Sequence, residues 1–222
     1  MAAASEYRQL PFIVPPDATE IVLARHGASQ PAKPGELFPR LDGHGDPELA
    51  PEGRAQAELL CARLRHEQID EVFVTGLKRT IETAAPLGRP ATAVPELMEV
   101  NLGDWEGGPF RIHMMNGEAL ALRVVAEERW DLIPGAETME QLADRVRKGI
   151  EKVVEQTGPG KIALVVAHGG VIGEVCRQAT NSRPFAFVHS DNCSLTRLVR
   201  FGDGRWLLRS FNDTSHLANQ AN

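Results

Sequence analysis

The stretch EIVLARHG, residues 20–27, joins a short apolar run to an arginine, a histidine and a glycine. A continuously apolar run of this length is typical of a strand buried on both faces, as strands in parallel sheets are. IALVVAHGG, residues 162–170, has the same form and again ends on histidine and glycine, and EVFVT, residues 71–75, is a third apolar run. We therefore predict buried strands over residues 20–24, 71–75 and 162–167.

Helical patterns follow these strands. Pro51 opens the first helix, at a position where the missing N–H of proline costs nothing. Thr75 is predicted to cap the second helix, and Thr138 begins the longest one through a capping box with Gln141. The apolar positions that recur at helical spacing are Ala57, Leu60 and Leu64; Leu77, Ile81 and Ala84; Met139, Leu142, Val146, Ile150 and Val153; and Val171, Ile172, Val175 and Ala179. This alternation predicts an α/β fold, a three-layer α/β/α sandwich with a mainly parallel sheet.

Other segments complete the predicted organisation. Residues 1–18 form a proline-rich arm, because their prolines exclude helix and central strand. Residues 30–51, rich in Pro, Gly and Asp, are predicted to be a long ordered loop of the kind that often carries function. Residues 192–200 and 205–211 flank a Gly-Asp-Gly turn and predict a hairpin. We find no internal repeat or domain boundary and predict a single domain over residues 1–222.

Composition excludes several classes of protein. The net charge is −6 and no long basic run is present, which argues against binding to nucleic acid or to a membrane surface. The three cysteines are widely spaced, so neither a disulfide framework nor a zinc site is predicted. We see no signal peptide and no apolar run of about 18 residues. A reducing, cytoplasmic setting is therefore expected.

The ends of the predicted strands gather polar groups. His26 and His168 each follow a buried strand, at the edge of the sheet where ligands bind in such folds. Arg25 belongs to the same turn as His26, and Arg79 lies in the first turn of the helix after the second strand. Taken singly, each histidine is more often structural and Arg79 is more often a solvated helix residue. Together, two guanidiniums and two imidazoles suit a dianionic phosphoryl group.

Four segments, in this order, resemble the signature segments of the histidine phosphatase superfamily, which has the phosphoglycerate mutase-like fold. The similarity covers roughly residues 20–180. The matching residues are Arg25-His26-Gly27 in LARHGASQ, Arg79 in VFVTGLKRTIETA, Glu99 in LMEVNLGDWEG and His168 in VVAHGGVIGEV. The resemblance implies a metal-independent phosphomonoester hydrolase, without a cofactor, that acts on a small phosphorylated metabolite through a phosphohistidine.

The resemblance also implies the role of each matched residue. His26 would attack phosphorus, which divides one difficult displacement into two easier ones. Arg25, Arg79 and His168 would hold the phosphoryl oxygens. Glu99 would protonate the leaving alcohol and then activate the water that hydrolyses the intermediate.

The surroundings of the acid can be anticipated from the same segment. An acid in this role should be partly desolvated, so Glu99 is expected near Trp105. Glu106 is the competing candidate for the role, and an ordinary surface carboxylate is the alternative for Glu99.

This sequence also departs from the family pattern. Members often carry Glu and then Ser or Thr after the first signature, and here the positions are Ala28 and Ser29. The asparagine that helps to bind phosphate in many members is replaced by Ala32. These changes imply that the loop holds phosphate differently or more weakly.

Alternative functions stay open. A mutase needs additional basic residues around the site, and the segment after Glu99 is short and not notably basic, so a phosphatase is favoured over a mutase. A weakly active member that binds phosphorylated ligands is a third possibility. A homo-oligomer in which the arm packs on a second subunit also stays open.

Several further residues are assigned only weakly. Arg111 and His113 are expected on a helix surface, with contact to substrate as the alternative. His44, His66 and His189 are expected in loops or on the surface. His216 either packs near the site or caps the C-terminal segment.

Overall fold

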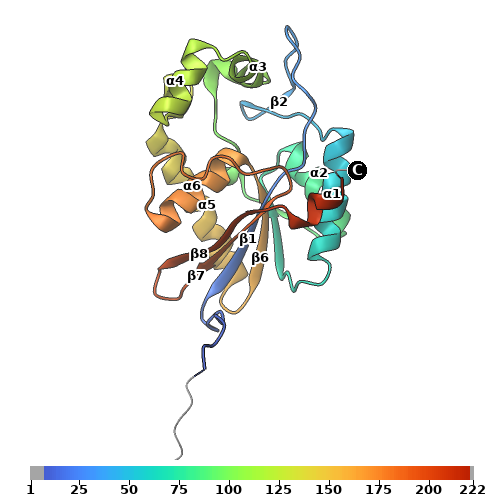
Figure 1. The fold of residues 1–222 in the computed structure, drawn as a ribbon, viewed down its shortest axis with the longest axis vertical. Coiled ribbons are helices and arrows are strands. Elements are labelled where there is room, and N and C mark those ends of the chain that lie inside the picture. Colours follow the sequence, from blue (N-terminus) through green and yellow to red (C-terminus); the bar gives the residue numbers. More distant parts are fainter. Residues whose placement is uncertain (1–7, 221–222) are drawn as a thin grey trace, which may run out of the picture.

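The computed structural model describes residues 8–220 and is built around a six-stranded sheet (Figure 1). The strand order is β5-β4-β6-β1-β7-β8. The strands are β1 (Thr19–Arg25), β4 (Glu71–Val74), β5 (Thr92–Ala93), β6 (Ile162–Ala167), β7 (Leu195–Arg200) and β8 (Trp206–Asp213). β5, β4, β6 and β1 are parallel, whereas β7 and β8 continue the sheet antiparallel, as the predicted hairpin.

Helices cover both faces of the sheet, which confirms the predicted α/β sandwich (Figure 1). They are α1 (Pro51–Leu64), α2 (Lys78–Ala84), α5 (Met139–Thr157) and α6 (Gly169–Thr180). Because side chains alternate along a strand, Ile21 and Leu23 of β1 pack with α5 and α6. Val22 and Ala24 pack with α1 and α2 on the opposite face. The apolar run of β1 is therefore buried on both sides, as its composition predicted.

Helix starts were predicted with mixed success. Pro51 begins α1, and Thr138 forms the predicted capping box, in which the Gln141 N–H donates to its hydroxyl at 3.1 Å. Thr75, in contrast, does not cap α2, because the N-cap residue is Leu77 and no side chain caps it. Ile81, expected on the buried face of this helix, is 48% exposed.

The segment predicted to be a long loop contains a small hairpin. Its strands are β2 (Arg40–Leu41) and β3 (His44–Gly45), which pair antiparallel. Asp42 and Gly43 between them both have positive φ, 48° and 86°. An Asp-Gly pair at these angles is a frequent two-residue hairpin turn, so the sequence did contain a signal for this hairpin.

A second group of helices lies beyond the end of the sheet at which β1 and β6 finish (Figure 1). It contains α3 (Pro109–Met115) and α4 (Ala119–Glu127), and a small apolar cluster of its own around Trp105, Val124 and Ile133. Short 3-10 helices complete the structure: η1 (Ala85–Leu87), η2 (Pro95–Leu97), η3 (Gly103–Trp105), η4 (Trp130–Leu132) and η5 (Ser215–Gln220).

Residues 8–18 of the N-terminal arm lie at the opposite end of the sheet from α3 and α4 (Figure 1). Residues 8–18 of the predicted arm contain no helix or strand, and residues 1–7 lie outside the described residues. Within the described part of the chain, no helix is long and apolar enough to cross a membrane.

Candidate active site

The two histidines lie side by side because their strands are neighbours. β1 and β6 pair in parallel with Arg25 opposite Ala167, so His26 and His168 leave the sheet at the same level. Their ring centroids are 5.2 Å apart, with an interplanar angle of 61°. Glycine is needed at position 27 because a Cβ there would lie 2.5 Å from the carbonyl oxygen of Gly53 in α1.

The tautomer of His26 follows from its hydrogen bond. Nδ1 lies 2.7 Å from the carbonyl oxygen of Gly27. Because a carbonyl oxygen only accepts, Nδ1 carries the proton and Nε2 keeps its lone pair. Burial, with the charges of Arg79 and Arg25, lowers the pKa of His26 well below its ordinary value of 6.5, so the ring is neutral. Asn192 Nδ2 donates to the His26 carbonyl at 2.8 Å and fixes its backbone.

His168 lies deeper than the sequence suggested. Its side chain is completely buried, and its Nε2 lies 2.9 Å from the hydroxyl of Thr75. Its Nδ1 has no hydrogen-bond partner among the described residues. Burial, followed by the charge of Arg79, lowers its pKa well below 6.5. In this structure His168 packs against the nucleophile candidate instead of forming part of the cavity wall.

The predicted arginines both reach the cavity next to His26. Arg79 is 6% exposed, so the alternative of a solvated helix residue is wrong. Its Nη1 donates to the Gly45 carbonyl at 2.8 Å, and burial lowers its pKa to about 10. Arg25 Nη1 donates to the Ser190 carbonyl. These bonds leave other guanidinium N–H groups to donate to an anion.

Arg111 is a third arginine at this site, although a helix surface was favoured for it. Its Nη1 donates to the Gln30 carbonyl and its Nη2 to the Ser29 hydroxyl, both at 2.7 Å. Its guanidinium lies over the ring of Phe38, 5.6 Å from the centroid. Burial and then the charge of Arg25 lower its pKa. The Gly-Gly-Pro sequence at 107–109 was the available signal, because it places Arg111 in the first turn of α3.

Glu99 and Glu106 differ in what their carboxylates do. Both oxygens of Glu106 accept backbone N–H groups, from Gly45 at 2.7 Å and Leu102 at 2.9 Å. This buried carboxylate therefore ties the β2–β3 hairpin to the loop after Glu99. Glu99 is half-buried and makes one short bond, from the Val100 N–H at 2.9 Å, and one long bond, from the Gly170 N–H at 3.4 Å. Glu99 is thus the freer of the two acids.

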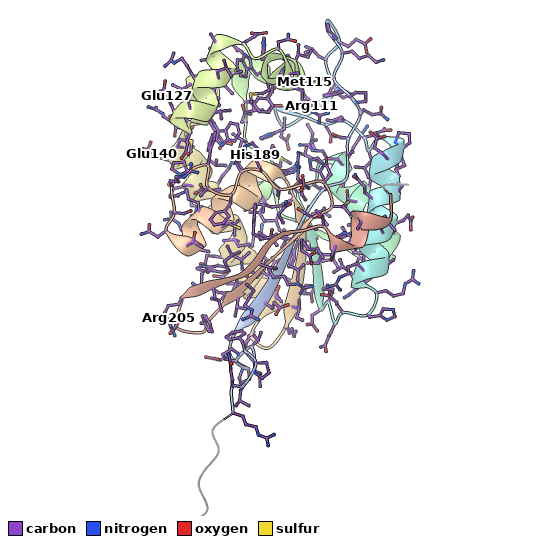
Figure 2. The ribbon with its side chains drawn as sticks, in the orientation of Figure 1. Arg111, Met115, Glu127, Glu140, His189 and Arg205 are labelled. Atoms are coloured by element: carbon purple, nitrogen blue, oxygen red, sulfur yellow. The ribbon has the colours of Figure 1, made fainter. Side chains whose placement is uncertain are left out.

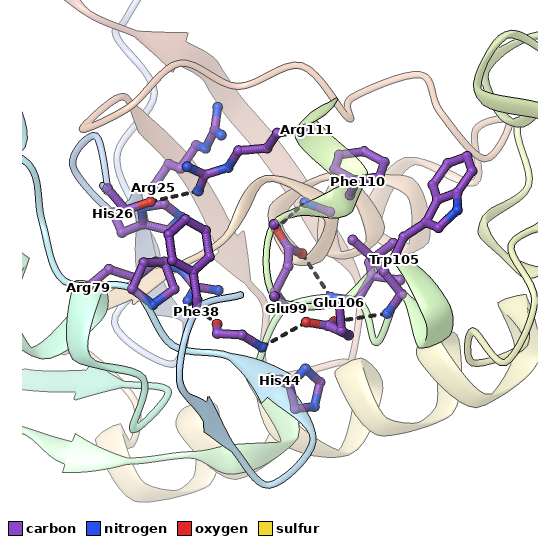
Figure 3. A pocket seen from close by; sticks show the side chains of 18 of the residues that line it. Arg25, His26, Phe38, His44, Arg79, Glu99, Trp105, Glu106, Phe110 and Arg111 are labelled. Carbon is purple, nitrogen blue, oxygen red and sulfur yellow. Dashed lines mark hydrogen bonds between the residues drawn. The ribbon is translucent and has the colours of Figure 1, made fainter. Parts of the chain in front are cut away.

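These groups surround a cavity of about 420 Å³ (Figure 3). Glu99 and Trp105, which were expected near each other, both line it. His44 lines it too, which corrects its assignment to a loop or surface position, and burial lowers its pKa. No group of three or more His, Cys, Asp or Glu side chains suited to a metal ion occurs among residues 8–220.

The other histidines lie outside the cavity. His113 stacks on Trp105 with ring centroids 4.5 Å apart. His216 Nε2 lies 3.0 Å from the carbonyl oxygen of Cys193, whose N–H donates to the Arg25 carbonyl. His66 and His189 are exposed, as predicted.

Comparison with known proteins gives consistent matches. The sequence profile of the histidine phosphatase superfamily (branch 1) matches residues 21–214. A phosphoglycerate mutase-like protein 4 of Arabidopsis thaliana is 30% identical over 215 residues, 90% of this chain and 88% of the relative. A metal-independent phosphoserine phosphatase of the same plant is 27% identical over 213 residues, 91% and 84% of the two chains. A solved mycobacterial glucosyl-3-phosphoglycerate phosphatase with inorganic phosphate has a TM-score of 0.68 at 26% identity, covering 89% and 98%.

The matched region contains all four segments on which the resemblance was based. The predicted phosphoglycerate mutase-like fold and the enzyme class are confirmed at this level. The chain belongs to branch 1 of the histidine phosphatase superfamily.

Proposed function

We propose that this protein hydrolyses phosphomonoesters through a phosphohistidine formed on His26. The observation that carries the proposal is the state of His26, a neutral ring whose Nδ1 proton is held by a carbonyl and whose Nε2 is free to attack. Nε2 forms a bond to phosphorus while the bond to the leaving oxygen breaks. Water then attacks phosphorus, the N–P bond breaks, and inorganic phosphate and neutral His26 are regenerated.

The phosphoryl group would be bound by the arginines around His26. Arg25 and Arg79 retain N–H donors next to the ring, and their charges stabilise the additional charge of the transition state. Arg111 adds a third cation from α3. His168, buried directly against His26 behind the cavity wall, would hold the ring in place.

Glu99 would move the proton in both steps. It gives a proton to the leaving alkoxide and takes one from the attacking water, so the proton count is restored after each turnover. Its partial burial and its position on the wall beside Trp105 support this role. Glu106 is less suited to it, because both of its oxygens accept short backbone hydrogen bonds, at 2.7 and 2.9 Å, whereas one of the two bonds of Glu99 is 3.4 Å long.

A phosphoglycerate mutase activity is the second candidate. Arg111 favours it, because a mutase must bind the phosphorylated acid at more than one point, and a third arginine had not been expected. The phosphatase remains the preferred proposal, since no lysine is found among the described residues that line the cavity. A reducing, cytoplasmic setting is part of the proposal and is supported by the three free cysteines.

The proposal is tested with p-nitrophenyl phosphate from pH 5 to 8 in the presence of a chelator. We expect wild type to turn over and His26→Ala to lose at least about a thousandfold in kcat. Rapid acid-free quenching should trap a phosphoprotein in wild type and not in His26→Ala. Exposed His66→Ala is the matched control and should resemble wild type.

Three outcomes would contradict the proposal. If the activity disappears with chelator, the reaction needs a metal ion and the metal-independent mechanism is wrong. If His26→Ala is fully active, His26 is not the nucleophile. Inactivity of wild type, combined with interconversion of 2- and 3-phosphoglycerate, would establish the mutase instead.

A further inference from the structure

The cavity has two chemically different ends. His26, Arg25 and Arg79 form a cationic end beside the nucleophile. Trp105 and Phe110 lie on the other side of Glu99 from His26 and Arg25 (Figure 3). Trp130 lines the same cavity. A phosphomonoester bound with phosphorus at His26 and its ester oxygen near Glu99 therefore directs its leaving group toward aromatic side chains.

The aromatic end is held rigid by its own packing. The ring centroids of Trp105 and Phe110 are 6.3 Å apart, and those of Phe110 and Trp130 are 6.0 Å apart. Trp130 also packs on Phe185, with centroids 4.4 Å apart. Since each ring is fixed by the next, a ligand that stacks here immobilises no additional side chain on binding. Flat rings gain most from such a wall, because aromatic pairs add to the effect of simple burial.

The charges around the leaving group disfavour a carboxylate on the substrate. Glu106 lines the cavity, and its carboxylate would repel a negatively charged leaving group, whereas Glu99 holds the proton that it gives to the leaving oxygen. Arg111 also lines the cavity, but the proposed function already assigns its charge, with those of Arg25 and Arg79, to the phosphoryl group. Among the described residues of the wall, none supplies an uncommitted cation for a second anionic group.

The size of the cavity fits a leaving group larger than a short alcohol. Its volume of about 420 Å³ lies within the range of about 300–1,000 Å³ found for small-molecule sites. We infer that the preferred substrates are phosphomonoesters whose leaving alcohol carries a flat, uncharged ring, and that small carboxylate-bearing esters are poor substrates. This inference rests on the proposed phosphomonoesterase activity and specifies its leaving group.

A panel of three primary-alcohol esters tests the preference. The esters are 2-phenylethyl phosphate, butyl phosphate and O-phosphoserine, so none has an activated phenolic leaving group. We expect kcat/KM for the phenylethyl ester to exceed that for the butyl ester about three- to tenfold, the range of one aromatic stacking contact. We expect it to exceed that for phosphoserine by at least tenfold.

Variants of α3 connect the preference to the wall. Phe110→Leu keeps an apolar side chain but removes the ring, so the ratio of kcat/KM for the phenylethyl and butyl esters should fall toward one. Met115→Ala is the matched control, since Met115 lies on the same helix and is 89% exposed (Figure 2). It should leave the ratio unchanged. Both kcat/KM values are measured on the same preparation, so a smaller fraction of active protein in the variant does not change their ratio.

The outcomes separate this inference from the proposed function. A preference for phosphoserine, or a ratio that Phe110→Leu leaves unchanged, overturns the inference while the hydrolase stands. If no ester is hydrolysed, the proposed function fails, and the inference is judged from the Kd values of the phenylethyl and butyl esters by quenching of tryptophan fluorescence. Equal Kd values would then overturn it, and tighter binding of the phenylethyl ester would support a ring-binding site.

Discussion

Arg145 of α5 holds the backbone that presents Glu99: its Nη2 donates to the Glu99 carbonyl at 2.9 Å, and its Nη1 to the Met98 carbonyl at 2.6 Å. The same guanidinium pairs with Glu137, which accepts the Asn101 N–H at 2.7 Å. The loop of the proposed acid is therefore fixed to the longest helix from both sides.

Arg145→Met is expected to impair proton delivery by Glu99. Esters with poor leaving groups depend on this proton, so kcat for butyl phosphate should fall about tenfold more than kcat for p-nitrophenyl phosphate. Steady-state kinetics on both esters measures the difference. Exposed Arg147→Met, on the same helix, is the control. An equal loss on both esters would show that Arg145 only supports the fold.

Arg111→Met is expected to weaken binding of the phosphoryl group. A charge-assisted hydrogen bond contributes about 1.5–3 kcal/mol, so the inhibition constant of inorganic phosphate should rise at least about tenfold. The effect should shrink in high salt, because the lost interaction is electrostatic. Arg129→Met, at an exposed position, is the comparison. An unchanged inhibition constant would place Arg111 outside the phosphate site.

The buried histidines should make stability depend on pH. Burial lowers the pKa of His26 and His168 in the folded protein below their ordinary value of 6.5. Below that pH the unfolded chain binds protons that the folded chain does not. The contribution of these two histidines to the free energy of unfolding is therefore fully present above about pH 6.5. It is lost as the pH falls below that value, by up to about 1.4 kcal/mol per pH unit for each histidine.

Urea unfolding at pH 7.5, 6.5 and 5.5 measures this loss. His26→Gln should flatten the dependence of the unfolding free energy on pH, whereas exposed His66→Gln should not. If His26→Gln shows the same dependence as wild type, the loss comes from other groups.

Gly27→Ala is expected to disturb the nucleophile. The added Cβ would lie 2.5 Å from the Gly53 carbonyl oxygen, so either the turn that carries His26 or the start of α1 must shift. We expect a loss of about 1–3 kcal/mol in unfolding free energy, with a fall in kcat of at least about tenfold. Thr138→Ala is the control, because it removes a cap worth about 1 kcal/mol at a position that does not line the cavity. Its kcat should be unchanged.

The parts of the fold that could be predicted depend on local pattern. β1 and β6 were recognised because a strand buried on both faces must be apolar at every position, and the capping box of Thr138 because its two partners are three residues apart. The segments that end at His26 and His168 came together because parallel neighbours finish at the same edge.

The parts that were missed depend on contacts between distant segments. Arg111 reaches the cavity only because Ser29 and Gln30 accept its hydrogen bonds, and they lie some 80 residues earlier in the chain. His44 lines the cavity because Glu106 anchors the hairpin that carries it. The position of Thr75 shows a different failure, since a hydroxyl near a helix start can bond a distant ring, here His168, instead of the helix.

The separate apolar cluster around Trp105, Val124 and Ile133 has a consequence for how such a protein can change. The positions of His26 and His168 are fixed by the pairing register of β1 and β6. A shift of one residue in this register would turn every side chain of the shifted strand to the other face of the sheet. The cluster under α3 and α4 has its own small interior, to which the strands of the sheet contribute no residue. Leu102 and Trp130 pack against both this cluster and the main core, so additive effects with substitutions at the strand ends are expected for the other residues of the cluster that do not line the cavity. Evolution or mutagenesis can thus change which leaving alcohols the protein accepts through the cluster under α3 and α4, while the residues at the strand ends that act on phosphorus stay unchanged.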